Sequence, residues 1–262
     1  MEGALLILIL LVVAAIGFAV YASAKASGRR SAASLADAKA DARRIIERLG
    51  GQVFALSGTD DASNQALADA SERYTAASSQ IDQATTARQA GLAKESALEG
   101  LYYVRAARTV MGMDPGPELE SLSGQRTAGT VTEDRKIAFE GREIEASPLP
   151  SERTPNYYPG GRVAGRPVPA GWYSEPWWKP ALVAGAWGVG SALLFSTMFS
   201  GMAGVGYGAQ GFESGYGDGY ADGMAAGQGG GFDGSGEAGG WNGGGDFSGG
   251  DFGGGDFGGF DF

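Results

Sequence analysis

The sequence predicts a mainly α-helical protein with two transmembrane helices, an α-helical coiled-coil-like middle region of two or three helices, a small β-hairpin and a disordered glycine-rich tail. Three observations support this fold class. Two uncharged apolar stretches, residues 4–22 and 181–202, are each about long enough to cross a bilayer as a helix. Residues 31–113 contain no proline and are rich in residues that favour helices. The residues after 202 are dominated by glycine and contain no Lys or Arg.

Changes in composition divide the chain into five segments. All ten prolines lie from Pro115 to Pro180, and nine of them fall in the third segment, which sets it apart from its neighbours. The segments are a transmembrane anchor (1–24), a helical coiled region (25–113), a proline-rich linker with a hairpin at 136–145 (114–179), a second transmembrane helix (180–202) and a disordered Gly/Asp/Phe-rich tail (203–262).

Charge is distributed unevenly along the chain. The formal net charge is −10, yet all 20 Lys and Arg residues lie from Lys25 to Lys179. This stretch also holds 20 of the 30 acidic residues and is therefore neutral, which argues against nucleic-acid binding because that needs a basic surface. Basic residues mark the cytoplasmic side of membrane segments. We therefore expect both termini outside the cell and residues 25–179 in the cytoplasm.

The first apolar stretch, residues 4–22, reads ALLILILLVVAAIGFAVYA and carries no charge. A cleaved signal peptide is the main alternative, because Ala22, Ser23 and Ala24 resemble a signal-peptidase site. Two features favour an uncleaved anchor. The residues before the stretch contain no Lys or Arg, and the apolar run is longer than the hydrophobic region of an ordinary signal peptide.

The middle region shows the spacing of packed helices. Apolar residues recur alternately every three and four positions, as in a heptad repeat. They are Leu35, Ala38, Ala42, Ile45 and Leu49, and then Leu67, Ala70, Tyr74, Ala77, Ile81 and Ala84. Gly50-Gly51 and residues 57–60 are the candidate breaks, with Asp60 or Asp61 as a cap for the next helix. A third helix is expected from about Leu92 to Met111, and the prolines of residues 114–117 stop it.

The proline-rich segment contains one candidate hairpin. Apolar and polar residues alternate over 136–145, with Glu140-Gly141 at the bend. A lone hairpin is only marginally stable, so it must pack on the helices or on a partner. The rest of the segment is expected to be an extended linker.

The second apolar stretch combines small residues with an aromatic cluster in front of it. Small residues recur every four positions, a pattern that lets helices pack closely in lipid. They are Ala184, Gly188, Ala192, Ser196 and Ser200. The preceding aromatic residues are typical of the headgroup layer, with a ligand-stacking platform as the alternative. They are Trp172, Tyr173, Trp177 and Trp178.

The tail ends in a short repeat. Asp-Phe pairs begin at Asp246, Asp251, Asp256 and Asp261, at a constant step of five residues. Such pairs on glycine spacers could act as weak multivalent contacts, and the alternative is a low-complexity tail without a binding site. The step does not match the calcium-binding repeats or loops, so we do not expect a calcium site.

Residue types limit the available chemistry. The chain has no Cys and no His, which excludes disulfides, thiolate nucleophiles, most zinc sites and His-based acid–base catalysis. We predict no catalytic, cofactor-binding or metal-binding residues and expect that the protein is not an enzyme. Tyr102, Tyr103, Arg105 and Arg108 form a candidate recognition patch, although at helical spacing they would more simply divide between core and solvent.

The aromatic segment carries a resemblance to a known group. Residues 157–162 read YYPGGR and residues 169–179 read PAGWYSEPWWK. They resemble a group of uncharacterised actinobacterial membrane proteins with an N-terminal anchor, an Ala-rich helical middle and a Gly-rich acidic tail. The resemblance implies a bacterial membrane protein and supplies no catalytic residues.

Together these features predict a membrane-anchored, non-enzymatic scaffold or interaction protein of a bacterial envelope. Its partners would be the lipid bilayer and either another protein or a second copy bound through the helices, with no nucleic acid and no small-molecule substrate. The alternative is a secreted or surface-attached binding protein with one anchor, in which residues 181–202 do not cross the membrane.

Overall fold

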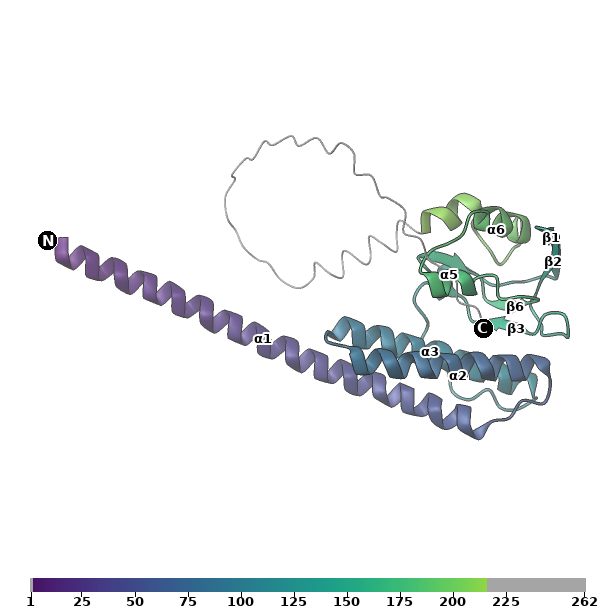
Figure 1. The fold of residues 1–262 in the computed structure, drawn as a ribbon, viewed down its shortest axis with the longest axis horizontal. Helices are drawn as coiled ribbons and strands as arrows, with labels where there is room; N and C mark the ends of the chain where they lie inside the picture. The colour runs from purple at the N-terminus through teal and green to yellow at the C-terminus, as the bar shows by residue number, and fades with distance from the viewer. Residues whose placement is uncertain (1, 216–262) are drawn as a thin grey trace, which may run out of the picture.

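The computed structural model describes residues 2–215, which form a helical part and a β part (Figure 1). The helical part is a bundle of α1 (Glu2–Ala55), α2 (Asp61–Gln83) and α3 (Ala87–Val110). Only the C-terminal portion of α1 lies along α2 and α3, and its N-terminal portion projects away from the rest of the protein (Figure 1). The β part packs on one side of the α2–α3 pair.

Both helix starts inside the bundle are fixed by reciprocal caps. The Asp60 carboxylate accepts a hydrogen bond from the Ser63 backbone N–H at 2.8 Å, and the Asp60 N–H donates to Ser63 Oγ at 3.1 Å. Thr86 and Gln89 exchange the same two bonds at the start of α3, each at 3.2 Å. These bonds satisfy N–H groups that a helix start leaves without partners. The predicted break at residues 57–60 and the Asp60 cap are present in the structure.

The bundle core consists largely of the predicted heptad residues. Ala42, Leu49, Ala70, Ala77 and Ile81 are all buried. The three alanines among them allow the helices to approach closely, and Leu49 and Ile81 fill the remaining space.

The predicted break at Gly50-Gly51 does not occur, because α1 continues to Ala55. A Cβ atom on Gly50 would lie 2.8 Å from Cε2 of Tyr74. In the same way, a Cβ atom on Gly100 would lie 2.4 Å from Cδ2 of Leu49. These two glycines therefore allow neighbouring helices to pack closely, and they do not mark a turn of the chain.

We expect Gly100→Ala to destabilise the protein by about 1–2 kcal/mol, since the overpacking cost exceeds the better helix propensity of alanine. Gly91 is the matched control because it lies in the same helix and an added Cβ there meets no atom within 4 Å. Gly91→Ala should stabilise by up to about 1 kcal/mol. Urea denaturation of both variants checks this, and equal effects at the two sites would contradict the packing role of Gly100.

The β part contains a four-stranded antiparallel sheet in the order β1-β2-β6-β3 and a separate two-stranded sheet, β4-β5. The strands are β1 (Arg135–Phe139), β2 (Arg142–Ser147), β3 (Asn156–Tyr158), β4 (Gly161–Val163), β5 (Arg166–Val168) and β6 (Gly171–Tyr173). β1 and β2 form the hairpin expected at 136–145. Its bend has φ of 48° at Glu140 and 77° at Gly141, the left-handed pair that a two-residue hairpin loop uses.

The interpretation of the remaining proline-rich residues as an extended linker is wrong. Strands β3 to β6 lie within them, and β6 joins the hairpin to β3 in one sheet. Tyr173 in β6 is fully buried, and its hydroxyl donates to the Pro169 carbonyl at 2.7 Å. Each of these strands has only three residues, too few for an alternating pattern to be recognised in the sequence.

The second apolar stretch is not one helix. It is divided between α5 (Lys179–Ala184) and α6 (Ser191–Phe199). The helices are separated at Gly185 and Gly190, which have φ of 69° and 91°, values that right-handed helix excludes. The every-four-residue series of small residues therefore does not form one helix face.

The apolar residues of this stretch build the core of the β part. Phe195, Met198 and Phe199 in α6 are at most 1% exposed. They pack with the sheet residues Ile144 and Tyr173 in one buried cluster. The hydrophobicity of the stretch therefore reflects a protein interior.

The predicted headgroup-layer position of the aromatic residues is also wrong. Tyr173 and Trp178 are at most 2% exposed, and their ring centroids lie 5.0 Å apart. Trp177 stands against Tyr173, with ring centroids 6.3 Å apart. Trp172 is 6% exposed and faces the helical part, as described below.

The prediction of two transmembrane helices is contradicted. Within residues 2–215, no helix combines the length and the apolar character needed to cross a bilayer. Residues 4–22 are not a separate helix but the beginning of the 54-residue α1, which continues through a polar sequence. The predicted membrane location, with both termini outside and residues 25–179 in the cytoplasm, depended on these spans and falls with them.

The beginning of the predicted disordered tail is folded. Phe212 is fully buried and stacks on Phe195, with ring centroids 4.4 Å apart. Met202 and Val205 are buried in the same cluster. The remainder of the tail, including the Asp-Phe repeat, lies outside the described residues.

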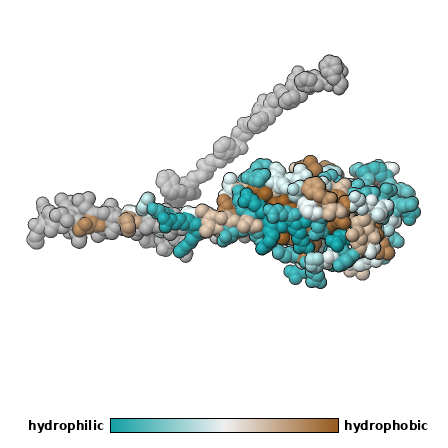
Figure 2. All heavy atoms as spheres, turned by 90° about the horizontal axis from the view of Figure 1, so that it is seen from below, coloured by the Kyte–Doolittle hydropathy of each residue, from teal (hydrophilic) through white to brown (hydrophobic). Residues whose placement is uncertain are grey.

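Apolar side chains are also present on the surface of the described part. On the face shown in Figure 2, brown hydrophobic patches alternate with teal hydrophilic areas over the folded end of the protein. Leu149 and Leu193 are 70% and 63% exposed, respectively, and they belong to different regions of the β part.

Candidate binding cleft between helix α3 and the sheet

The helical part and the β part meet along a row of aromatic rings. Tyr103 of α3 stands edge-on to Tyr157 of β3, with ring centroids 6.1 Å apart. Tyr157 in turn lies against Trp172 of β6 at 5.0 Å. Trp172 packs on Ala62 of α2 and Ala106 of α3 in a small buried cluster. This row fixes α3 relative to the sheet.

Two charged clusters lie near this interface, and the first of them joins the two parts. Lys179 of α5 pairs with Asp69 at 3.0 Å and with Glu72 at 3.2 Å, both in α2. Burial raises the pKa of the Asp69 carboxyl, although the Lys179 ammonium opposes this shift. Because the Asp69 side chain is only 8% exposed, its carboxylate depends on Lys179 for compensation.

The second cluster lies within the helices. Arg73 of α2 is 3.6 Å from the Glu99 carboxylate of α3, and the Tyr103 hydroxyl donates to Glu99 at 3.3 Å. Burial raises the pKa of Glu99, and the Arg73 charge only partly offsets it. Burial also raises the pKa of Tyr103 well above its ordinary value, so this hydroxyl keeps its proton and remains a donor.

We expect Glu99→Gln to weaken the pH dependence of stability. The folded pKa of Glu99 lies above 4.5, so folded Glu99 retains a proton that the unfolded chain has already released. Its stabilising contribution is therefore complete below pH 4.5 and is lost as the pH rises through the folded pKa. Gln keeps an acceptor for Tyr103 and cannot ionise. Urea denaturation from pH 4 to pH 8 checks this, and parallel curves for the two proteins would contradict it.

An open cleft of about 480 Å³ lies beside this aromatic row, between α3 and the loop that follows β2. We call it the aromatic cleft. Its lining residues are Tyr102, Arg105, Ala106, Thr109, Val110, Pro148, Leu149, Pro150, Tyr157 and Trp172.

The aromatic walls of the cleft are held in place. The Tyr102 hydroxyl contacts the Glu120 carbonyl at 3.2 Å and Gln125 Oε1 at 3.1 Å. Burial raises the pKa of Tyr157 to about 12, so its ring carries a neutral hydroxyl at physiological pH. Trp172 is fixed by its packing on both helices. The rings therefore form a prearranged surface, which lowers the entropic cost of binding.

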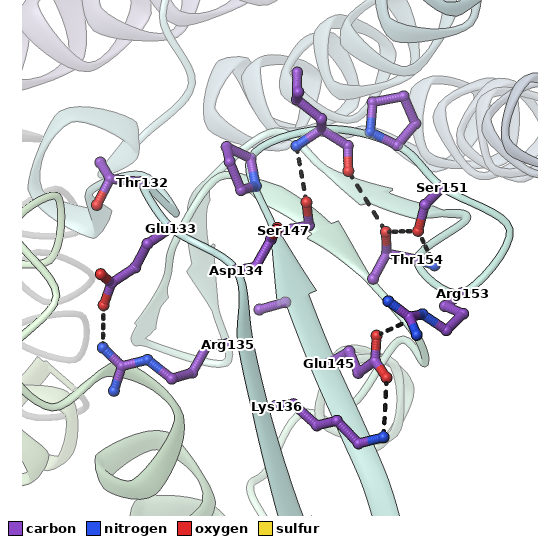
Figure 3. A pocket seen from close by; sticks show the side chains of 14 residues that line it. Thr132, Glu133, Asp134, Arg135, Lys136, Glu145, Ser147, Ser151, Arg153 and Thr154 are labelled. Atoms are coloured by element: carbon purple, nitrogen blue, oxygen red, sulfur yellow. Dashed lines mark hydrogen bonds and ion pairs between the residues drawn. The ribbon is translucent and has the colours of Figure 1, made fainter.

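The opposite wall is a short loop braced by hydroxyl groups (Figure 3). Ser147 Oγ accepts from the Leu149 backbone N–H at 3.1 Å. Ser151 and Thr154 join their hydroxyls at 2.8 Å, and Ser151 Oγ also accepts from the Thr154 N–H at 3.1 Å. Leu149, between two prolines, is thereby kept exposed beside the cleft.

Arg105 is the one charged residue that lines the cleft within the described part of the chain. Its guanidinium donates to the Pro117 carbonyl at 3.0 Å, and none of the ion pairs among residues 2–215 involves it. A guanidinium has five donors arranged for carboxylate recognition, so capacity remains for an anion. The aromatic cleft thus combines ring surfaces with a cation that pairs with no carboxylate of the described residues.

A charged groove of about 570 Å³ lies on the other side of the same loop (Figure 3). Most of its charges are paired within the protein, and Asp134 is the one charged lining residue without an ion pair among residues 2–215. Glu145 contacts Arg153 at 3.2 Å and Lys136 at 3.5 Å, and Arg135 pairs with Glu133. These internal pairs leave little charge for a ligand, so the groove is a weaker candidate than the aromatic cleft.

A third hollow, of about 490 Å³, lies between the α2–α3 pair and β4 and is lined by Glu95, Glu99 and Arg162. Its polar groups are also used internally. Glu95 accepts from the Ser123 N–H at 2.9 Å, and Arg162 donates to the Gly215 carbonyl at 3.4 Å. Among residues 2–215, no three acidic side chains are grouped so that they could hold a metal ion.

The structure separates the residues of the predicted recognition patch. Tyr102 and Arg105 line the aromatic cleft, whereas Tyr103 is buried at the interface of the two parts. Arg108 lines a different hollow, near Pro115, and Arg105 borders that hollow as well, through its hydrogen bond to the Pro117 carbonyl. Of the aromatic residues considered as a stacking platform, only Trp172 reaches the cleft.

Sequence reasoning missed the contribution of the residues after β2 and of Tyr157. Pro148, Leu149, Pro150 and Tyr157 were all part of the expected linker, and Tyr157 was otherwise used only for the family resemblance. The available signal was an apolar Leu between two prolines, a rigid and exposed arrangement. Comparisons of the chain with protein-family models, with curated proteins and with solved structures each gave no match.

Proposed function

We propose that this protein is a non-enzymatic interaction protein whose aromatic cleft binds an extended peptide segment. The segment would carry an aromatic side chain next to a carboxylate. The observation that carries the proposal is the proximity of the Tyr102, Tyr157 and Trp172 rings to Arg105, which has no carboxylate partner among residues 2–215.

The expected binding free energy of one such contact is small, so binding to the cleft should be weak and readily reversible. Burying one Phe side chain gains about 1.5–3 kcal/mol, and a hydrogen bond to a charged group gains about 1.5–3 kcal/mol. Loss of ligand freedom offsets much of this, so one contact gives a dissociation constant no tighter than about 1 mM. Repetition of the motif would raise the affinity by avidity.

The helical part would act as the scaffold. At 1.5 Å per residue, the 54 residues of α1 extend about 80 Å. The C-terminal portion of α1 belongs to the bundle, while the N-terminal portion projects away from it (Figure 1). This arrangement would hold the cleft at a distance from whatever the beginning of α1 contacts.

The proposal is tested by titrating the full chain with the peptide GGDFGGDFGG while recording backbone amide shifts by NMR. We expect saturable shifts at the end of α3 and in the loop after β2. The peptide GGDAGGDAGG, which lacks the rings, should cause none. Arg105→Gln and Leu149→Asp should each weaken binding about tenfold, the loss of one charged or apolar contact.

The matched control is Leu193→Asp. Leu193 is 63% exposed, close to the 70% of Leu149, but it lies in α6 and does not line the cleft. This variant should bind the peptide as the wild type does. Binding that is insensitive to Arg105→Gln and Leu149→Asp would refute the proposed site.

A further inference from the structure

We propose that the aromatic cleft is occupied by the Asp-Phe repeat of the same chain. This inference rests on the proposed function, because it names the segment that the cleft binds. The repeat consists of Asp246-Phe247, Asp251-Phe252, Asp256-Phe257 and Asp261-Phe262.

The chemistry of the repeat matches that of the cleft. Each pair offers one ring for the aromatic walls and one carboxylate for Arg105, the cation that lines them. A glycine follows three of the four Phe residues within two positions, so little side-chain bulk hinders entry of the backbone. Beyond Lys179 the chain contains no Lys or Arg, and therefore this segment carries no cation that would compete for its own carboxylates.

The chain is long enough to bring the repeat to the cleft. The described part ends at Gly215, which is held at the β4–β5 sheet by the hydrogen bond from Arg162 to its carbonyl at 3.4 Å. The residues from Gly215 to Asp246 could extend at most about 100 Å, more than any path across a domain of this size requires. The repeat can therefore reach the cleft without displacing any described element.

Because the repeat is covalently joined to the protein that carries the cleft, even a weak contact is enough to fill the cleft for part of the time. A ligand joined by a linker to its site reaches an effective concentration of order 1 mM, comparable with the affinity expected for one Asp-Phe contact. Four equivalent pairs increase the fraction of time that the cleft is filled. An external peptide must then compete with the tail of the full chain.

The first test uses full-length chains. In one variant, Phe247, Phe252, Phe257 and Phe262 are all changed to Ser. A control variant carries Tyr216→Ser and Trp241→Ser, which remove aromatics outside the repeat that have no carboxylate beside them in the sequence. We expect the first variant to bind GGDFGGDFGG about threefold to tenfold more tightly than the wild type, because the internal competitor is gone. The control should bind as the wild type does. Equal affinity in all three chains would overturn the inference while leaving the proposed function intact.

The second test does not depend on the added peptide. A photo-crosslinking phenylalanine analogue is placed at position 252 of the full chain, and the products are mapped by mass spectrometry. We expect crosslinks to residues 102–110 and 147–154, and their loss when Leu149→Asp is added. No crosslink at these residues would overturn the inference. In a mixture of heavy and light chains, crosslinks that join only different chains would overturn occupation by the same chain.

Discussion

Phe195→Ala is expected to destabilise the protein by about 3–5 kcal/mol. Phe195 is fully buried at the centre of the β part and stacks on Phe212 and Tyr207, with ring centroids 4.4 Å and 5.2 Å away. Removing the ring loses its transfer free energy and leaves a cavity between side chains that cannot all collapse. Urea denaturation followed by tryptophan fluorescence measures the effect, because Trp177 and Trp178 lie in the same cluster.

Leu193→Ala provides the control for this prediction. Leu193 lies in the same helix, only two residues away, but it is 63% exposed. Its replacement should change the free energy of unfolding by at most about 0.5 kcal/mol. Similar effects of the two substitutions would mean that α6 does not bury one face against the sheet.

Lys179→Met is expected to destabilise the protein by about 2–3 kcal/mol near neutral pH. The change leaves the Asp69 carboxylate buried without its cation, and breaking a buried pair costs about 3–5 kcal/mol. We take a smaller value because the Lys179 side chain is 32% exposed, so solvent screens part of the pair. The deficit should shrink as the pH falls towards 3.8, since protonated Asp69 needs no cation.

Two further variants isolate this charge effect. Adding Asp69→Asn to Lys179→Met should restore much of the lost stability, because the buried charge is removed. Lys136→Met removes a surface lysine whose side chain is 50% exposed, and it should cost no more than about 1 kcal/mol. Chemical denaturation at pH 7 and pH 4 checks both. A deficit in Lys179→Met that is equal at the two pH values would contradict the role assigned to Asp69.

The helical part was predictable because its signals are local. Heptad spacing marks the buried faces, and Asp60 caps α2 as expected. The exception is Gly50, where the sequence indicated a break and the structure has a continuous helix. The reason is tertiary, since the Tyr74 ring of α2 occupies the space that a side chain at position 50 would fill.

Beyond the β1–β2 hairpin, the β part was not predictable, and the reason is physical. An apolar run of about 20 residues is compatible with lipid or with a protein interior, and its composition alone does not distinguish them. The decisive features are Gly185 and Gly190, whose left-handed backbone divides the run. Strand β1, which packs against α6, belongs to the predicted hairpin, whereas strands β3 to β6 have only three residues each and are too short to be recognised before the fold is known.

The candidate site was predictable only in part. Tyr102 and Arg105 were noted as a patch on one helix, and both line the aromatic cleft. Leu149 and Tyr157 come from a loop and a strand distant in sequence, and only the docking of the β part on α3 brings them to the same place. No local pattern specifies that docking.

The most direct test of this account is whether the β part docks on α3 in solution. Nuclear Overhauser effects between aromatic ring protons of the full chain measure this contact. We expect a cross-peak between Tyr103 and Tyr157, whose rings stand edge to face with centroids 6.1 Å apart, and another between Phe195 and Phe212. If the Phe195–Phe212 cross-peak is present but Tyr103 shows none to Tyr157, the β part folds without forming the aromatic cleft, and the account is contradicted.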